Sequence, residues 1–446
     1  MPATSKLGQK RSEMMNLSGW GRFPVIDCDA YVFETESAAS ALLNSSAHWI
    51  ARGLGKSYGD SSLNQKVLLT SRFDKLLDFD PGTGVVKCES GVTLSELIDV
   101  FLPRGWFLKV TPGTKLISVG GAIASDVHGK NHHVQGCFSS SVRTFRLLLP
   151  DGQIVNCGRE QNRELFRATC GGMGLTGLIL DVDLQLIPVS SAFVRERVIP
   201  CRNLRNAFEE FEAWQHIPYT VAWIDCLAKG ERLGRSVLML GDHAEDGDLS
   251  PPLSRPLSVP FDCPSNMLNT FSVALFNRLY YYFKGNPVQD HRIPLDSFFY
   301  PLDKIVNWNR IYGTPGFTQY QFVLPKEISY DGLRKILEAV ASAGMGSFLA
   351  VLKLFGTQND NLLSFPMEGY TLALDFKIQP KLFPLLDRLD AIVLDHGGRL
   401  YLSKDCRMPP RVFAQGYPRL DEFRSLRERY GMAAKFSSLQ SRRLEL

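Results

Sequence analysis

Residues 110–145 read VTPGTKLISVGGAIASDVHGKNHHVQGCFSSSVRTF, and this stretch decides how the fold is interpreted. It contains glycines among mostly small residues, namely Gly113, Gly120, Gly121, Gly129 and Gly136. Because such a backbone carries few side chains, it can lie flat against a planar ligand that bears phosphate. His128, Lys130, His132 and His133 lie in the same stretch, and titratable groups beside a bare wall favour an anionic, redox or acid–base site.

These basic residues are also compatible with a metal site or with no site at all. A metal site would use the imidazoles, but the stretch shows no spaced set of carboxylate or thiolate partners, so we expect no metal. A solvent-exposed basic loop that binds nothing would carry the same residues.

Two further glycine-rich segments strengthen the ligand interpretation. Residues 51–64 read ARGLGKSYGDSSLN, and their glycines could turn several backbone N–H groups toward one phosphate. Alone, that loop could be a plain turn between strands, and its spacing is not the Rossmann pattern G-x-G-x-x-G. Residues 170–188, CGGMGLTGLILDVDLQLIP, place more glycines before a strand. Three such segments are harder to explain as chance turns than one, so we expect a shared groove.

The 446-residue length and the mixture of short strands and helices predict an α+β fold with two interlocked domains. Residues 1–190 combine glycine turns with strand-like runs, and the Pro-Asp-Gly triplet at 150–152 predicts a hairpin. Residues 191–405 form the second domain, in which 316–405 follow a β-α-β-β-α-β order typical of a separate antiparallel sheet with helices on one side. The tail, 406–446, is polar and helical.

Composition excludes several classes of protein. The formal net charge of +4 without a Lys/Arg-rich run argues against a nucleic-acid partner. The first residues lack an apolar signal region, and no apolar run could span a bilayer, so we expect a cytoplasmic protein without signal peptide or transmembrane helix. The nine cysteines are dispersed without a CxxC pair, which predicts reduced, buried thiols.

The chain resembles the vanillyl-alcohol-oxidase family of FAD enzymes, which carry a PCMH-type FAD-binding domain, and within it a branch that oxidises polyprenyl-phosphate-linked sugars. The matching segments are SGWGR (18–22), ARGLGKSYGD (51–60), TPGT (111–114), VGGAIASDVHGKNHH (119–133), GGMGLTG (171–177), AWID (222–225), PLDKIVNWNRIYG (301–313), QYQF (319–322), KLFG (353–356), LSFPMEGY (363–370), LYLSKD (400–405) and YPRLDEF (417–423). HGKNHH and SYGD are the specific motifs, whereas the glycines alone are not.

The resemblance implies a fold and a cofactor. The FAD-binding domain would comprise two α/β subdomains from residues 1–190, joined by 406–446, while 191–405 would form an α+β substrate domain. Many relatives attach the flavin through a His in the first glycine loop; here Lys56 stands before Ser57, so we expect non-covalent FAD. The residues expected to bind FAD are Arg52, Gly53, Leu54, Gly55, Lys56, Ser57, Tyr58, Gly59, Pro112, Gly113, Thr114, Gly120, Gly121, Ala122, Ser125, His128, Gly129, Asn131, Gly174, Gly177 and Ile179.

The substrate side of the site follows from the same resemblance. Its expected residues are Lys130, Trp223, Gln319, Gln321, Lys353, Asp375 and Lys404. Tyr58, His128 and Lys404 are the expected catalytic residues. Lys404 would hold or deprotonate the substrate hydroxyl, because partial desolvation can lower its pKa; the alternative is an ordinary surface lysine. Lys130 and Lys353 could pair with a substrate phosphate.

Sequence pattern adds detail to this expectation. Gln319 and Gln321 share one strand face by period-two alternation, so both can meet one ligand. The chain departs from the sugar-oxidising branch at Thr371, Ala373 and Phe299, where those relatives carry Asn, Cys and Tyr. These departures concern the sugar and the lipid more than the flavin chemistry.

The activity implied is oxidation of a secondary alcohol of a sugar, the 2′-hydroxyl of a polyprenyl-phosphate-linked pentose, to a keto sugar. This would be the first half of an epimerisation for cell-envelope polysaccharide, completed by an NAD(P)H-dependent keto-sugar reductase as partner. The alternatives are an aldonolactone oxidase that uses a small soluble sugar lactone and O₂, and a flavin-binding protein without catalysis. Only substrate assays separate the two oxidases.

A lipid-linked substrate would also need an apolar approach. The segment TFSVALFNRLYYYFKGN at 270–286 follows a Pro- and Ser-rich stretch, 244–266, that predicts a long loop. The aromatic segment could form a lip at the inner face of a membrane, which would make the protein peripheral there. An aromatic stripe of this kind is more often ordinary core.

Overall fold

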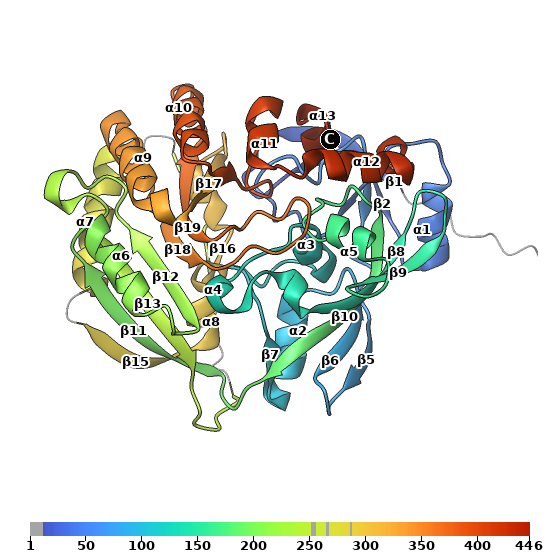
Figure 1. The fold of residues 1–446 in the computed structure, drawn as a ribbon, viewed down its shortest axis with the longest axis horizontal. Coiled ribbons are helices and arrows are strands. Elements are labelled where there is room, and N and C mark those ends of the chain that lie inside the picture. Colours follow the sequence, from blue (N-terminus) through green and yellow to red (C-terminus); the bar gives the residue numbers. More distant parts are fainter. Residues whose placement is uncertain (1–11, 251–255, 265–266, 286–287) are drawn as a thin grey trace, which may run out of the picture.

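The computed structural model describes residues 12–250, 256–264, 267–285 and 288–446. Its strands form a four-stranded, a six-stranded and an eight-stranded sheet and one small pair, with helices against them (Figure 1). The α+β prediction is confirmed. Among the described residues, no helix combines the length and apolarity needed to cross a membrane.

The first two sheets come from the N-terminal part of the chain. The four-stranded sheet has the order β1-β2-β4-β3, and the six-stranded sheet has the order β5-β6-β10-β8-β9 with β7 on β10. The strands are β1 (Ser12–Ser18), β2 (Val25–Val32), β3 (Ile50–Arg52), β4 (Lys66–Leu69), β5 (Leu76–Asp80), β6 (Val85–Glu89), β7 (Trp106–Leu108), β8 (Val142–Leu148), β9 (Ile154–Gly158) and β10 (Leu178–Pro188). The helices are α1 (Glu36–Leu43), α2 (Leu94–Phe101), α3 (Val119–Ala124), α4 (His132–Gln135) and α5 (Arg163–Thr169).

Local sequence signals explain several of these elements. The predicted hairpin at 150–152 joins the antiparallel strands β8 and β9, and Gly152 there has φ +86°, which suits glycine. Helix α3 begins in the decisive stretch, where the Ser118 hydroxyl accepts a hydrogen bond from the Gly121 N–H. Its first turn therefore presents glycine rather than bulky side chains.

The third sheet is antiparallel and has the order β15-β11-β13-β12-β18-β19-β17-β20. Its strands are β11 (Phe193–Cys201), β12 (Tyr219–Ile224), β13 (Ser236–His243), β15 (Gln289–Pro294), β17 (Phe317–Pro325), β18 (Ala350–Phe355), β19 (Gly369–Lys377) and β20 (Arg399–Leu400). The associated helices are α6 (Leu204–Ala213), α7 (Thr270–Gly285), α8 (Leu295–Phe299), α9 (Ser329–Ala343) and α10 (Leu382–Asp395). A separate small pair joins β14 (Leu257–Ser258) to β16 (Ile305–Val306).

The structure corrects the prediction that residues 316–405 form a separate sheet. The β-α-β-β-α-β order over 316–405 is confirmed, but its strands do not form a sheet of their own. Ala222 and Trp223 of β12 pair with Leu352 and Val351 of β18, so two sets of strands merge into one sheet. Alternation fixes which face a side chain occupies but not which strand lies beside it. The loop predicted over 244–266 falls partly outside the described residues, and its described part contains β14.

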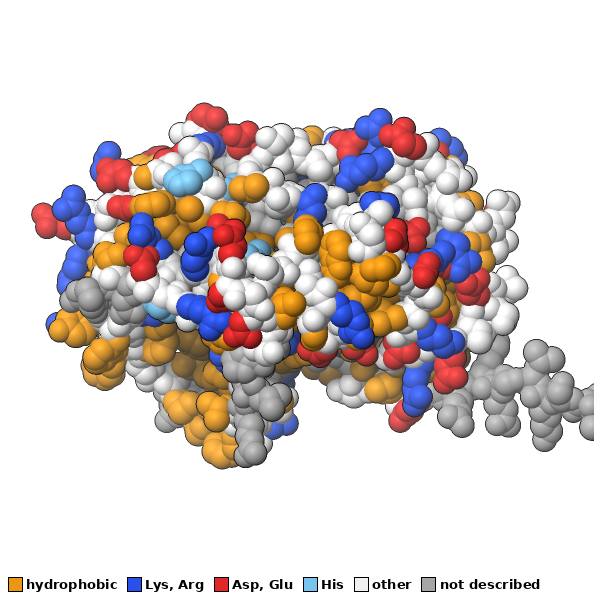
Figure 2. All heavy atoms as spheres, turned by 90° about the horizontal axis from the view of Figure 1, so that it is seen from below, with side chains coloured by type: hydrophobic (Ala, Val, Ile, Leu, Met, Phe, Trp, Pro, Cys, Tyr) orange, Lys and Arg blue, Asp and Glu red, His pale blue; other side chains and the backbone are white. Residues whose placement is uncertain are grey.

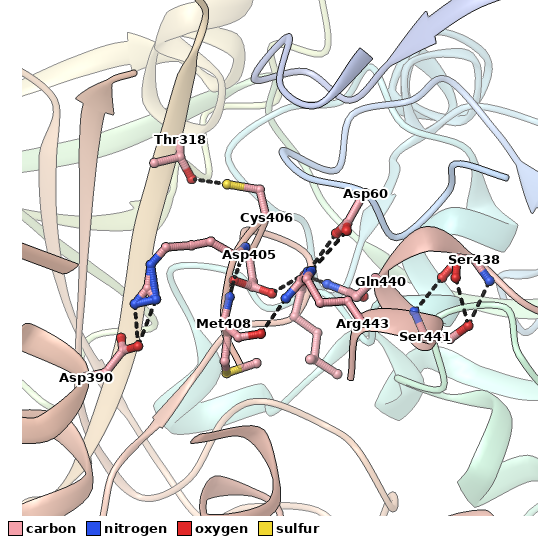
Figure 3. A network of polar contacts seen from close by, with 12 residues as sticks. Asp60, Thr318, Asp390, Asp405, Cys406, Met408, Ser438, Gln440, Ser441 and Arg443 are labelled. Atoms are coloured by element: carbon pink, nitrogen blue, oxygen red, sulfur yellow. Dashed lines mark hydrogen bonds and ion pairs between the residues drawn. The ribbon is translucent and has the colours of Figure 1, made fainter. Parts of the chain in front are cut away.

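The C-terminal segment packs back onto the N-terminal sheets. It contains α11 (Pro410–Gly416), α12 (Leu420–Arg429) and α13 (Leu439–Arg443). A backbone bridge joins Trp49 to Phe436. Arg443 donates to both Asp60 and Asp405 (Figure 3), and each of these hydrogen bonds is 2.8 Å long. One C-terminal arginine therefore holds the end of the first glycine loop beside the residue that follows Lys404.

Candidate active site

One cavity of about 930 Å³ lies between the glycine-rich segments and the eight-stranded sheet. This volume is at the upper end of the range for ligand pockets, so it suits an extended cofactor together with a substrate. The expected FAD-binding residues that line it are Gly53, Leu54, Gly55, Lys56, Ser57, Tyr58, Pro112, Gly113, Thr114, Gly120, Gly121, Ser125, His128, Gly174, Gly177 and Ile179. The expected substrate residues that line it are Lys130, Trp223, Gln319, Gln321, Lys353 and Lys404.

Other expected FAD-binding residues lie outside the cavity lining. Arg52 donates from its guanidinium to the Ser18 carbonyl at 2.6 Å. Ala122 is fully buried in the core beneath α3. Asn131 donates to the Lys109 carbonyl at 2.9 Å. These residues shape the wall from behind and do not face the cavity.

Two expected glycines are also outside the lining, and backbone contact explains them. A Cβ on Gly59 would lie 1.8 Å from the Asp405 carbonyl oxygen, and one on Gly129 would lie 2.8 Å from the Thr111 carbonyl oxygen. Only glycine allows these close approaches. Asp375, expected on the substrate side, is 1% exposed and accepts a hydrogen bond from Gln319 Nε2 at 2.6 Å.

The cavity wall suits a flat ligand that carries phosphate. A Cβ added at Gly113 would meet no atom within 4 Å, and one at Gly121 would meet only the Ser118 hydroxyl. The wall also offers hydrogen-bonding atoms, because Ser90 Oγ and His128 Nδ1 are buried without a partner among the described residues. Bare backbone and unused polar atoms are the features that a cofactor such as FAD requires.

Lys404 lies where Tyr58 and the eight-stranded sheet meet. Its Nζ is 3.8 Å from the centroid of the Tyr58 ring, which is a cation–π distance. Burial lowers the pKa of Lys404 and neighbouring Lys353 lowers it further, while Asp375 opposes both effects. Burial in turn raises the pKa of Asp375. A lysine that is easily deprotonated therefore faces the cavity, so the surface-lysine alternative does not describe it.

His128 forms the polar end of a small network. Its Nε2 lies 3.2 Å from Gln321 Nε2, which also donates to the Thr371 hydroxyl at 3.2 Å. The ring packs against Phe355 and Tyr401. Burial holds the pKa of His128 well below its usual value, so the imidazole is neutral. With Nε2 as acceptor, the proton is on Nδ1, which is the atom without a partner among the described residues.

Lys130 and Lys353 add positive charge to the same cavity. Burial lowers the pKa of Lys130 to about 7 and that of Lys353 to about 8. Lys130 donates to the Phe298 carbonyl, whereas within the described chain Lys353 forms no ion pair with a carboxylate. An anion entering the cavity would raise both pKa values and be bound by the charge it stabilises.

The predicted basic cluster is divided by the fold. His132 Nδ1 accepts from the Gly356 N–H at 3.2 Å, and His133 Nε2 lies 2.9 Å from the Ile217 carbonyl oxygen; neither ring lines the cavity. In the described ranges, no group of three or more His, Cys, Asp or Glu residues is arranged for a metal ion. His128 is 6% exposed, so a solvent-exposed basic loop is excluded at that position.

Sequence reasoning missed several residues of the cavity wall. Trp20 stacks under Lys56, whose Nζ is 3.5 Å from the ring centroid. Tyr401 donates to the Ser125 carbonyl at 3.2 Å. The motifs SGWGR and LYLSKD contained the signal for both residues. Glu196 lines the wall as well, but no local pattern marks it, because its partners come from distant segments.

Comparison with known proteins identifies the family. A family model described as "FAD binding domain" matches residues 34–158. Decaprenylphosphoryl-beta-D-ribose oxidase of Mycolicibacterium smegmatis is 35% identical over 452 residues, covering 96% of this chain and 97% of that protein. This chain belongs to the decaprenylphosphoryl-β-D-ribose oxidase family. The resemblance to PCMH-type FAD enzymes is thereby confirmed, and the chain is an FAD-dependent oxidoreductase acting on CH–OH groups.

Two other relatives differ in how much of this chain they match. The "uncharacterized protein in mprA 5′ region" of Streptomyces coelicolor is 32% identical over 80% of this chain and 100% of that protein. A putative D-arabinono-1,4-lactone oxidase of Neurospora crassa is 25% identical over only 38% of this chain and 31% of that protein. The match to the oxidase family is therefore nearly complete, whereas the lactone-oxidase match is local.

Proposed function

We propose that this family member oxidises the 2′-hydroxyl of a polyprenyl-phosphate-linked pentose to a keto sugar. The observation that carries the proposal is the convergence of Lys130, Lys353 and Lys404 on one cavity beside the bare glycine wall. Lys130 and Lys353 can pair with the anion of a sugar phosphodiester, which a neutral sugar lactone lacks, while Lys404 remains available as the base. The full-length relationship to a decaprenylphosphoryl-ribose oxidase supports the same substrate class.

The residues suggest how the hydroxyl proton is removed. Bound FAD supplies the acceptor for the hydride. Lys404 Nζ takes the hydroxyl proton, because burial keeps this amine partly neutral near pH 7. Tyr58 faces the ammonium with its ring and stabilises the charge that forms. Neutral His128 and Gln321 orient the sugar, while Asp375 acts from behind as a positioning residue for Gln319 and Lys404.

The cofactor and the partners complete the proposal. The FAD is non-covalent, since Lys56 of the glycine loop cannot form the usual histidyl link and instead packs on Trp20. The product is a keto sugar, so an NAD(P)H-dependent reductase must complete the epimerisation. The enzyme acts in the cytoplasm and peripherally at the inner face of a membrane, where polyprenyl phosphates reside.

Anaerobic reduction of the holoenzyme by candidate substrates tests the function. The flavin absorbance should bleach with polyprenyl-phosphate pentoses in detergent and stay unchanged with free aldonolactones. Bleaching by a soluble lactone alone would assign the enzyme to lactone oxidation instead. Denaturation followed by filtration tests the linkage, because non-covalent flavin passes the filter and covalent flavin stays with the polypeptide.

A further inference from the structure

Helix α7 is attached to the molecule by its polar side. Asn277 is fully buried, and its amide donates to Asp225 Oδ1 at 2.9 Å. Near the C-terminal end of the helix, Lys284 Nζ lies 3.1 Å from the buried carboxylate of Glu196. Surface helices normally bury apolar residues and expose polar ones. Here two polar anchors face inward beside the buried Val273, and many of the apolar residues of the helix are left exposed.

The outward face of α7 is apolar and aromatic. Phe271 is 77% exposed and Phe283 is 70% exposed, and Leu275, Leu279 and Tyr282 are exposed between them. Single exposed apolar residues are ordinary, but a row along one helix marks a binding surface. This result departs from the expectation that the aromatic stripe is more often core.

Charge on this helix has one sign. The segment 270–285 contains no Asp or Glu, and Arg278 is exposed on the same helical face as Leu275. In the part of the chain that the structure describes, Arg278 forms no ion pair. A cation within an apolar row matches anionic headgroups above acyl chains.

The apolar row continues into the active-site cavity. Phe276, Tyr280 and Lys284 of α7 line it. Val306 of β16 lines the cavity too, and the paired strand β14 carries Leu257 at 72% exposure. We define the apolar lip as the exposed residues of α7 together with β14 and β16. Figure 2 shows hydrophobic side chains gathered at the lower left of the molecule around a hollow.

We propose that the apolar lip docks on a lipid bilayer and opens the cavity directly to it. This inference rests on the proposed function, because a polyprenyl chain then moves between bilayer and cavity without crossing water. A protein seated on the lip, including a second copy of this chain, would cover the opening through which substrate must pass. A bilayer instead supplies the substrate.

Vesicle sedimentation of the holoenzyme tests the lip. Vesicles of phosphatidylcholine with about 30% phosphatidylglycerol should pellet the native enzyme, and the double variant Phe271→Asp/Phe283→Asp should lose at least about tenfold in partitioning. The matched control is Leu77→Asp/Ile154→Asp, which places the same charges at exposed apolar sites on β5 and β9, and should pellet like the native enzyme. Arg278→Gln should weaken binding only when phosphatidylglycerol is present.

Three outcomes would overturn the inference. The native enzyme could stay in the supernatant, the control could lose as much as the lip variant, or the native enzyme could be dimeric while the lip variant is monomeric. The last result would assign the surface to a second copy. Flavin bleaching by polyprenyl-phosphate pentose in detergent is measured in parallel. Vesicle binding without such bleaching would reject the proposed function alone, since sedimentation does not depend on turnover.

Discussion

Replacing Asp375 by Asn should move the pH dependence of flavin reduction to lower pH. Asp375 is buried, accepts from Gln319 Nε2 at 2.6 Å and from the Tyr312 hydroxyl at 3.4 Å, and raises the pKa of Lys404 through its charge. Asparagine keeps the shape and removes that charge. Two unit charges about 6–8 Å apart interact by about 2–3 kcal/mol at an effective dielectric constant of about 20, which corresponds to about two pKa units.

The sign follows from which form of Lys404 reacts. In the proposed mechanism the neutral amine is the base, so the rate should rise with pH through the pKa of Lys404. Loss of the Asp375 charge lowers that pKa, and the acid limb of the profile should move down by about one to two pH units. The maximal rate should also fall, because a weaker base accepts the proton less readily.

Anaerobic stopped-flow bleaching between pH 5 and pH 9 (about the range in which such groups titrate) measures this profile. Asp390→Asn is the matched control: Asp390 is also buried, and burial raises its pKa to about 7, but it bonds Tyr320 and Arg407 away from the cavity. Its profile should keep the native midpoint. An acid limb that stays in place in Asp375→Asn, or moves to higher pH, would refute the role given to the carboxylate.

Three other perturbations test separate parts of the site. Lys404→Met should retain FAD in the visible spectrum but bleach about a hundredfold more slowly, and Lys404→Arg should not restore the rate, because guanidinium does not deprotonate. Gly121→Leu should weaken FAD binding in fluorescence titration by about tenfold or more, whereas Gly121→Ala should change it little, since the larger side chain enters the cavity. Arg443→Met should lower the free energy of unfolding by about 3 kcal/mol in urea titration, because it leaves the buried carboxylates of Asp60 and Asp405 unpaired; an unchanged midpoint would contradict this.

The sequence predicted which segments line the cavity better than it predicted what each residue in them contacts. Three glycine-rich segments were expected to share one groove, and Gly53, Gly113 and Gly174 do line one cavity. Yet Gly59 and Gly129 carried the same signal and serve close backbone contacts instead. Glycine marks a place where a Cβ is not tolerated, and the sequence cannot tell whether ligand or chain occupies the space.

The neighbours of a residue in a sheet depend on strand register, and the sequence did not predict that register. Asp375 was expected on the substrate side, and the register of β17 and β19 places it opposite Gln319, which lines the cavity whereas Asp375 does not. Alternation assigns faces within a strand, whereas the partner across the sheet depends on tertiary packing. The exposure of the aromatic row of α7 also depends on a tertiary contact, because the hydrogen bond from Asn277 to Asp225 sets which side of the helix faces outward.

Backbone contacts hold the segment around Lys404 against the first glycine loop. The absence of a Cβ at Gly59 lets the Asp405 carbonyl approach, and the Tyr58 N–H donates to the Ser403 carbonyl at 2.9 Å. Arg443 then neutralises both Asp60 and Asp405 at this contact (Figure 3). Lys404 lies between these fixed points, so its distance from a ligand on the glycine loop changes little with side-chain rotation elsewhere. Catalysis by proton and hydride removal requires this kind of fixed geometry, and here the C-terminal segment is part of what maintains it.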